Sequence, residues 1–248
     1  MDGILVVDKP QGWTSHDVVN FIRRRFKIKK AGHSGTLDPM ATGILIVLLG
    51  GYTKFSNEFM DSAKEYKAVL TLGTSTDTQD STGNVIKTQS VPELKKEDIE
   101  KALEGFKGQI EQVPPMFSAI KFKGQRLYKL ARQGVRIQRS MRKVNITALC
   151  LEKFEPPHIW LSVTCNKGTY IRTLCEDVAS SLGCLGHMSY LRRTRSGGFS
   201  INQAVSIERL KEIQTEDLKS LVLQTLASKI APSPSPSPLW GEGRGEGD

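Results

Sequence analysis

Residues 32–50 read GHSGTLDPMATGILIVLLG, a glycine-rich segment that runs directly into a stretch as apolar as any in the sequence. The apolar residues 44–49 predict a buried strand, which would anchor the preceding segment to the core. The glycines allow unusual turns and a close approach to a ligand, and Pro39 restricts Asp38 to an extended conformation. The segment therefore predicts a rigid loop that presents one carboxylate. Taken alone, an Asp-Pro pair is more often a simple turn, so a catalytic role for Asp38 needs support from elsewhere.

The composition is that of an ordinary globular protein, with 248 residues, 38% hydrophobic and 25% charged. This length suffices for one large domain or two small ones. No run of eighteen apolar residues occurs, so no membrane span is expected. The N-terminus, MDGILVVDKP, lacks the basic start and uninterrupted apolar core of a signal peptide. These features predict a cytoplasmic protein.

The net charge is +9 at pH 7, and two segments carry much of the excess. Residues 23–30 (RRRFKIKK) contain six basic residues in eight, which fits either a solvated helix end or a binding surface. Residues 121–143 contain nine Lys or Arg and no Asp or Glu. Such a segment repels itself unless a polyanion lies against it. The pattern predicts a nucleic-acid partner held through its phosphates.

Hydrophobic periodicity and turn residues predict a mixture of strands and helices. Thr14 or Ser15 is expected to cap the first helix, with Asp17 in its first turn. We expect strands at residues 3–7, 44–49, 65–73, 84–90, 144–155, 159–165 and 187–199. We expect helices at residues 14–26, 53–62, 91–108, 169–183, 206–213 and 216–229, and loops at residues 32–43 and 74–83. Residues 231–248 (APSPSPSPLWGEGRGEGD) are of low complexity, so we expect a folded domain over residues 1–230 and a disordered tail.

Asp38 has the chemistry of a ready nucleophile, because an aspartate with a pKa of about 3.9 is already an anion at neutral pH. Tyr66 and Tyr170 are aromatic residues that could stack on a base, although a half-buried strand tyrosine is common. Arg172 could pair with a buried carboxylate or lie on a helix surface. No metal-binding, Walker, dinucleotide-binding or Ser-His-Asp pattern is apparent. The residues favour chemistry on a nucleic-acid base with neither a cofactor nor a required metal.

Six segments, in this order, resemble the tRNA pseudouridine-55 synthase (TruB) family. They are KPQGWTSHDVV, GHSGTLDPMATG, EYKAVLTLGTSTDTQDSTG, QVPPMFSAIKFKGQRLYKLARQG, KGTYIRTL and YLRRTRSGGF. Ordered blocks are far more specific than one short motif. The resemblance implies an α+β (mixed α/β) pseudouridine synthase fold, with a largely antiparallel central sheet, flanking helices and a basic thumb-like insertion at about residues 121–143. It also implies the reaction: a uridine in the T-loop of tRNA, uridine 55, is detached at N1 and rejoined through C5.

The resemblance assigns a catalytic trio. Asp38 falls on the catalytic aspartate, which attacks C1′ of the ribose or C6 of the base, or stabilises a glycal intermediate; these alternatives stay open. Tyr66 falls on the tyrosine that stacks on the target base and is a candidate for assisting proton removal at C5. Arg172 falls on the arginine that pairs with the aspartate.

The resemblance also assigns substrate contacts. His33 would meet the RNA beside the flipped target, or else simply satisfy the loop backbone. Tyr170 would be a second pocket tyrosine, and Leu191 would line the base pocket, although a strand leucine is otherwise ordinary core. The thumb cations expected to hold the RNA are Lys121, Arg126, Arg132 and Arg136. No chemistry is assigned to residues 76–83 (TDTQDSTG).

We expect a monomer that binds the T-stem-loop of tRNA. Many bacterial family members carry a further RNA-binding PUA domain, which residues 231–248 are too few to form. Two alternatives are a non-catalytic tRNA-binding or RNA-folding factor and a pseudouridine synthase that acts on another RNA. The trio of Asp38, Tyr66 and Arg172 disfavours the first, because a carboxylate facing phosphates weakens binding. The short N-terminus and compact thumb favour the tRNA enzyme over the second.

Overall fold

A computed structural model describes residues 1–224 as a mixed α/β fold built on one large sheet. Within these residues ten strands belong to the sheet. Its path is, in spatial order, β14 (Val205–Ser206), β1 (Gly3–Lys9), β3 (Thr42–Leu49), β12 (Gly186–Ser196), β4 (Lys64–Leu72), β11 (His158–Cys165), β10 (Arg142–Glu155) and β7 (Gly108–Gln112). In addition, β2 (Ala31–Ser34) pairs with β3, and β13 (Phe199–Ser200) pairs with β12. Only the pairs β1–β14 and β3–β12 in this path are parallel, so the largely antiparallel sheet expected from the sequence is confirmed.

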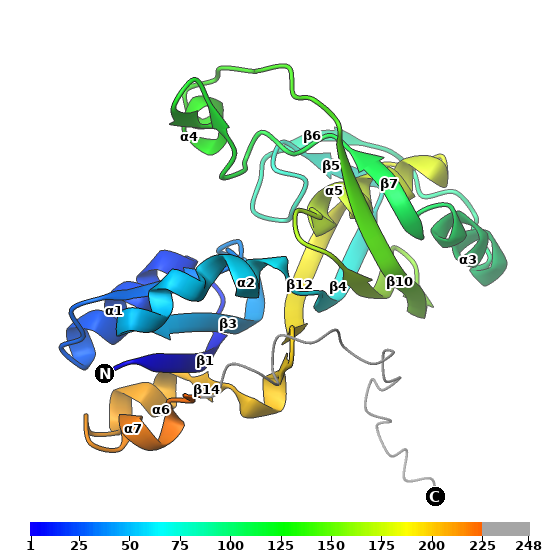
Figure 1. The fold of residues 1–248 in the computed structure, drawn as a ribbon. Helices are drawn as coiled ribbons and strands as arrows, with labels where there is room; N and C mark the ends of the chain where they lie inside the picture. The colour runs from blue at the N-terminus through cyan, green and yellow to red at the C-terminus, as the bar shows by residue number, and fades with distance from the viewer. Residues whose placement is uncertain (225–248) are drawn as a thin grey trace, which may run out of the picture.

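Helices and two small hairpins surround the sheet (Figure 1). The helices are α1 (Ser15–Arg25), α2 (Ser56–Asp61), α3 (Lys96–Glu104), α4 (Leu127–Arg132), α5 (Ile171–Ser181), α6 (Ile207–Glu212) and α7 (Leu218–Leu221), with short 3-10 turns η1 (Gly50–Phe55) and η2 (Ile201–Gln203). The hairpins are β5 (Thr74–Thr76) with β6 (Val85–Thr88), and β8 (Lys121–Phe122) with β9 (Gln125–Arg126). None of the helices in residues 1–224 combines the length and the apolar character needed to cross a membrane.

The apolar strand β3 is buried on both faces, which explains its unbroken hydrophobic sequence. Its even-numbered residues Ile44, Ile46 and Leu48 share a core cluster with Phe59 of α2 and with Phe199. Its odd-numbered residues face the opposite side, where they pack with residues of α1, α6 and α7. A strand covered on both faces gains from an apolar side chain at every position. The loop that precedes β3 is therefore attached to the most firmly buried part of the N-terminal lobe, which we define as residues 1–61.

Helix α1 begins with a capping box, and its N-cap is Thr14, one of the two caps expected from the sequence. Thr14 is the N-cap: its hydroxyl accepts from the Asp17 backbone N–H at 3.0 Å, and the Asp17 carboxylate accepts from the Thr14 N–H at 2.8 Å. Ser15 is left free for a different contact described below. The basic end of the helix has a structural use, because Arg25 donates a hydrogen bond of 2.7 Å to the carbonyl of Ile213 beyond α6.

Several element boundaries differ from the sequence expectation. The expected loop 32–43 begins instead with the last three residues of β2, because the long partner β3 offers them backbone pairing. The expected loop 74–83 likewise begins with β5. The expected helix 91–108 is confined to Lys96–Glu104 and is followed by β7. The expected helix 216–229 is four residues long within the described chain, and residues 225–229 and the expected tail 231–248 lie outside the described residues.

The two halves of the sheet meet at β12, which pairs with β4 on one edge and with β3 on the other. β12 runs beside β4 along most of its length, but it pairs with β3 only at Arg192–Thr42 and Arg193–Gly43. Gly43 has φ +99°, and a Cβ atom there would lie 2.2 Å from the backbone oxygen of Arg193. This junction therefore requires a glycine for two separate reasons, its backbone conformation and the close approach of β12.

We predict that Gly43→Ala lowers the free energy of unfolding by about 2 kcal/mol or more, because strain and steric overlap add. Urea unfolding followed by circular dichroism measures the loss. The matched control is Gly183→Ala, because Gly183 has φ +70° but nothing within 4 Å of its added Cβ; it should lose about 1 kcal/mol. Equal losses in both variants would contradict a steric contribution at the junction.

Candidate active site

Asp38 opens a tight turn that is pinned from several sides. The Ala41 N–H donates to the Asp38 carbonyl at 3.0 Å, which closes a turn with Pro39 at its second position. The Ser15 hydroxyl and the Leu37 backbone exchange hydrogen bonds of 3.2 and 2.8 Å. The Gly12 N–H donates to the Pro39 carbonyl at 2.8 Å. Asp38 therefore lies in a turn, as its Asp-Pro pair predicts, and the contacts of the same turn hold the loop in place.

A buried lysine adds to this support and was missed by the sequence analysis. Lys9, at the end of β1, is fully buried, and its ammonium group donates to the carbonyls of Trp13 at 2.6 Å and Pro39 at 3.3 Å. Burial lowers the pKa of Lys9 to about 8, although the nearby Asp38 carboxylate acts in the opposite direction. The Lys-Pro turn in the sequence gave no sign that the lysine would point inward.

Arg172 pairs with Asp38 through two of its nitrogens. Its Nε lies 2.8 Å from Asp38 Oδ2, and its Nη2 donates to Oδ1 at 3.3 Å. The arginine side chain is 5% exposed, whereas the Asp38 side chain is 32% exposed. Arg172 also donates to two backbone carbonyls, from Nη1 to Thr78 at 3.0 Å and from Nη2 to Phe117 at 2.9 Å. A bidentate pair held in this way fixes the carboxylate in one orientation and leaves part of it accessible to a ligand.

The polar loop 76–83, to which the sequence analysis assigned no chemistry, is the second support of Arg172. Asp80 is buried, and its Oδ2 lies 3.7 Å from Arg172 Nη1. Its Oδ1 accepts from the hydroxyls of Thr78 and Thr82 at 2.8 and 2.6 Å. The contacts are tertiary, since residues 80 and 172 are far apart in the sequence, so no local pattern could have indicated them.

The protonation of Asp38 reflects a balance of these neighbours. Burial raises the pKa of Asp38 above its ordinary value, and the Asp80 carboxylate adds to the rise. The Arg172 guanidinium and the Lys9 ammonium oppose it. Arg172 therefore makes the rise in the pKa of Asp38 smaller, but it does not bring the pKa down to the ordinary value. Arg172 thus favours the ionised form of Asp38, as expected, but only against the larger effect of burial.

Tyr66 and Leu191 lie on the neighbouring strands β4 and β12. Tyr66 of β4 is directly opposite Arg193 of β12, and Leu191, two residues earlier, is on the same face. Leu191 is 5% exposed and belongs to the main core cluster, against which Tyr66 packs. Burial raises the pKa of the Tyr66 phenol, while the positive charge of Arg193 acts against this. The phenol is consequently neutral at pH 7.

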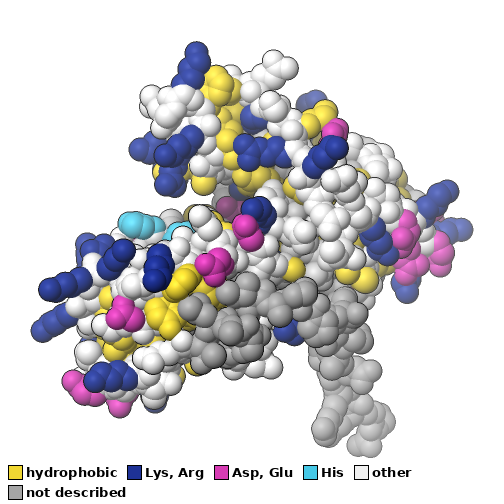
Figure 2. All heavy atoms as spheres, in the orientation of Figure 1, with side chains coloured by type: hydrophobic (Ala, Val, Ile, Leu, Met, Phe, Trp, Pro, Cys, Tyr) yellow, Lys and Arg dark blue, Asp and Glu magenta, His cyan; other side chains and the backbone are white. Residues whose placement is uncertain are grey.

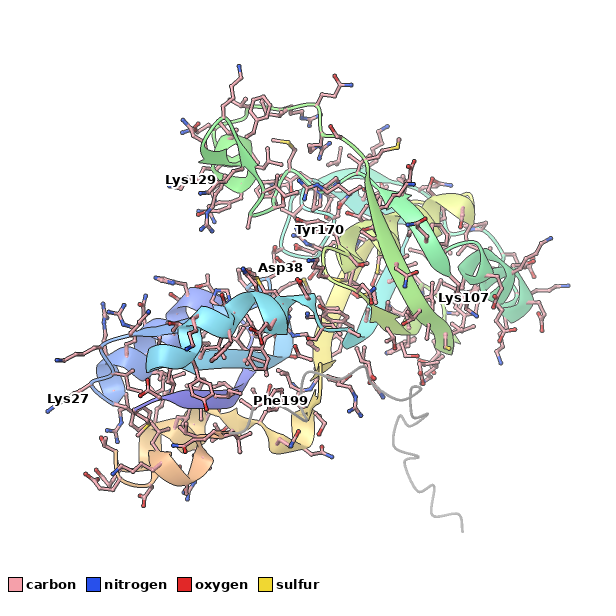
Figure 3. All side chains as sticks on the ribbon, in the orientation of Figure 1. Lys27, Asp38, Lys107, Lys129, Tyr170 and Phe199 are labelled. Atoms are coloured by element: carbon pink, nitrogen blue, oxygen red, sulfur yellow. The ribbon has the colours of Figure 1, made fainter. Side chains whose placement is uncertain are left out.

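Tyr170 precedes α5, and both of its backbone polar groups are held by Gln112. The Tyr170 N–H donates to Gln112 Oε1 at 3.0 Å, and Gln112 Nε2 donates to the Tyr170 carbonyl at 3.3 Å. Figure 3 places Tyr170 and Asp38 on facing sides of the space between the two halves of the molecule. Burial raises the pKa of the Tyr170 phenol. Gln112, which is almost fully buried, is a further supporting residue that the sequence did not indicate.

His33 of β2 and the thumb (residues 121–143) are the other places where RNA contacts were expected. Figure 2 shows a hollow between the thumb, where Lys and Arg side chains gather, and the N-terminal lobe. Lys121, Arg126, Arg132 and Arg136 are all exposed. Burial lowers the pKa of His33, and the cations Arg193 and Arg126 add to the effect. Within the described residues His33 Nδ1 has no hydrogen-bond partner, so the alternative of a loop-stabilising histidine gains no support there.

The fold is that of pseudouridine synthases of the Cbf5 and TruB type. A structure titled as a Cbf5-Nop10-Gar1 complex matches with a TM-score of 0.66 and 31% identity, over 83% of this chain and 52% of that chain. A structure of an H/ACA RNP bound to a substrate RNA containing 2'-deoxyuridine matches with a TM-score of 0.62 and 28% identity, over 83% of this chain and 51% of that chain. The chain thus spans about half the length of the solved chains that it matches.

The sequence relatives are more specific. Residues 23–171 match the N-terminal domain of the TruB family pseudouridylate synthases, and residues 172–232 match the tRNA pseudouridylate synthase B C-terminal domain. The tRNA pseudouridine synthase B of Syntrophotalea carbinolica is 46% identical over 95% of this chain and 76% of that protein. The enzyme of the same name from Clostridium tetani is 47% identical over 86% of this chain and 73% of that protein. The chain belongs to the TruB family of pseudouridine synthases.

We predict that the pKa of Asp38 lies above that of an ordinary aspartate and rises further in Arg172→Lys, because lysine cannot maintain the two-point contact. NMR titration of carboxyl-labelled aspartate measures both values, with Asp38→Asn identifying the signal. Arg195→Lys is the matched control: Arg195 pairs with Glu65 at 3.1 Å, and Glu65 faces away from Tyr66 on β4. An Asp38 pKa that is unchanged in Arg172→Lys would show that this guanidinium does not set it.

Proposed function

We propose that the protein converts uridine 55 in the T-loop of tRNA to pseudouridine, with Asp38 as the catalytic carboxylate. The observation that carries the proposal is the bidentate contact between Asp38 and Arg172, 2.8 Å at its shorter side, in which the carboxylate remains partly exposed. Membership of the TruB family and the names of the most similar relatives support tRNA as the substrate. A tRNA substrate would be met in the cytoplasm.

The residues suit the steps that this isomerisation requires. The reaction must cleave the bond between N1 of the base and C1′ of the ribose, rotate the base, and form a bond from C5 to C1′, with the C5 proton lost and N1 protonated. An ionised Asp38 provides a negative charge that attacks C1′ or C6 or stabilises a glycal intermediate. Arg172 holds the carboxylate in position. The ring of Tyr66 is placed to stack on the base, while Tyr170 and Leu191 would complete the pocket.

Binding must also extract the uridine from the loop. Unstacking a base costs a few kcal/mol, and stacking on an aromatic side chain returns about 1–3 kcal/mol. The thumb cations Lys121, Arg126, Arg132 and Arg136 are exposed, and the thumb borders the hollow that Figure 2 shows. They are suited to hold the phosphates of the T-stem-loop while His33 contacts the nucleotides beside the target. Recognition would then depend on the shape of a splayed RNA loop.

The first test uses unmodified tRNA transcript, carbodiimide labelling and primer extension. We predict a stop at the T-loop uridine with the wild-type protein and a rate reduced by at least about 10²-fold in Asp38→Asn, which keeps the shape but loses the charge. Filter binding of the same transcript serves as the control and should change little. Tight binding without product in the wild type would favour the RNA-folding factor, whereas product only on another RNA would redirect the substrate assignment.

The second test concerns the thumb. Replacing Lys121, Arg126, Arg132 and Arg136 by alanine should weaken tRNA binding and reduce the slope of log K against log[salt] by about three, because four phosphate contacts no longer release counterions. The control replaces four exposed lysines elsewhere, Lys96, Lys101, Lys107 and Lys153. Lys107 lies at the end of the molecule opposite the thumb residue Lys129 (Figure 3). An identical salt slope in thumb variant and wild type would rule out a thumb that faces RNA.

A further inference from the structure

The position of Arg172 depends on the loop between β5 and β6. Arg172 Nη1 donates to the Thr78 carbonyl at 3.0 Å and faces Asp80 at 3.7 Å. The hydrogen bonds of Asp80 to Thr78 and Thr82 make this loop internally rigid, but they do not attach it to the rest of the domain. The loop must therefore also be attached to the rest of the domain if it is to hold the Arg172 guanidinium in the correct orientation.

Ser81 and Gln79 provide that attachment. The Ser81 N–H donates to the Met188 carbonyl of β12 at 3.0 Å, and Gln79 adds contacts to both β12 and α5. The Gln79 backbone carbonyl accepts from the Met188 N–H of β12 at 3.0 Å. Its side-chain amide is held at both ends by α5: Oε1 accepts from the Thr173 hydroxyl at 2.9 Å, and Nε2 donates to Glu176 Oε2. Gln79 also has φ +64°, a backbone conformation that a non-glycine residue adopts at a cost. The side-chain contacts hold the residue in this conformation, and the neighbouring Thr78 carbonyl is thereby directed at Arg172.

Thr173 and Glu176 lie one helical turn apart, so they present their polar atoms on one face of α5. Arg172 itself is the residue before Thr173. The helix that carries the guanidinium thus also carries the two groups that hold its partner loop. A displacement of the loop relative to α5 would change the distance between Arg172 and Thr78 directly, and through Arg172 the geometry at Asp38.

We propose that Gln79 and Glu176 are positioning residues for the catalytic pair: their hydrogen bond holds the Thr78 carbonyl against Arg172, and so keeps Arg172 aimed at Asp38. The proposal rests on the proposed function, because it assumes that Asp38 is the catalytic group. It adds two residues from a loop and a helix face to which the sequence gave no role.

The surroundings of Glu176 define which charges bear on the contact. A cavity of about 450 Å³ borders Gln79, Thr173 and Glu176, and its other side is formed by the root of the thumb. The charged neighbours are Arg139 and Asp177, and Glu111 lines the same cavity. Burial raises the pKa of Glu176, while its hydrogen bond with Gln79 and the charge of Arg139 oppose this. On the other side of the network, Asp38 faces Arg172, Asp80 and Lys9.

The test compares four variants on tRNA under single-turnover conditions as a function of pH. Gln79→Asn tolerates a positive φ, but its amide is one methylene too short to reach Glu176. Glu176→Ala removes the acceptor without altering the loop, and Glu176→Gln retains an acceptor oxygen. Gln89→Ala is the matched control, because Gln89 Nε2 donates to the Gly183 carbonyl at 3.0 Å beyond the far end of α5, away from Arg172.

We expect Gln79→Asn and Glu176→Ala to lower the maximal rate about tenfold with unchanged tRNA affinity, since small misplacements of catalytic groups are costly. The acid limb of the pH–rate profile should move to higher pH, because a less well-placed guanidinium opposes the raised pKa of Asp38 less effectively. Glu176→Gln should recover most of the rate, and Gln89→Ala should behave as wild type. A merely structural role would lower thermal stability and leave the acid limb in place.

A double-mutant cycle with Arg172→Lys completes the test. If Gln79 acts through Arg172, Gln79→Asn should cause little further loss in the Arg172→Lys background. Full additivity, or an unchanged acid limb in both Gln79→Asn and Glu176→Ala, would overturn the proposal. Glu176→Ala decides alone if Gln79→Asn fails to fold. An inactive wild type would count against the proposed function itself, whereas an active wild type with unaffected variants would count only against this inference.

Discussion

The geometry of the site depends on one buried guanidinium. Arg172 contacts Asp38, the carbonyls of Thr78 and Phe117, and the carboxylate of Asp80. These acceptors come from three segments that are remote in sequence: the loop before β3, the loop between β5 and β6, and the chain that leads into the thumb. A buried arginine that lost these partners would be strongly destabilising. The requirement to satisfy one cation therefore brings together the parts of the active site.

The sheet provides the frame in which this cation can act. Because β12 pairs with β4 along one edge but with β3 over only two residues on its other edge, the sheet has a junction at Gly43 and Arg193. The loop of Asp38 enters β3 directly before this junction, and Tyr66 lies across from Arg193 on β4. The carboxylate from one half of the sheet and the aromatic ring from the other are thus positioned by the same strand. Burial of β3 on both faces makes that placement rigid.

Some of the basic residues stabilise the fold, whereas others are exposed and available to a ligand. Within residues 23–30, Arg25 ties α1 to the chain after α6, so part of this basic segment serves the fold. The thumb cations are exposed instead, on a segment that borders the hollow in Figure 2. Lys9 and Arg193 are buried and contact backbone carbonyls of the loop that carries Asp38. Cations therefore occupy three kinds of position: exposed on the thumb, at the end of α1, and buried beneath the loop that carries Asp38.

The sequence by itself determined the elements whose signals are local. The apolar run 44–49, the capping box of Thr14 and Asp17, and the position of Arg172 at the start of a helix all follow from neighbouring residues. The ordered family blocks also identified Asp38 and Arg172 as partners. Only the tertiary structure decided that residues 31–34 form a strand, that Lys9 and Gln112 point inward, and that Asp80 and Gln79 support Arg172. The physical reason is that a hydrogen bond between residues about a hundred positions apart leaves no periodicity in the chain: its partners are fixed by the packing of strands and helices between them.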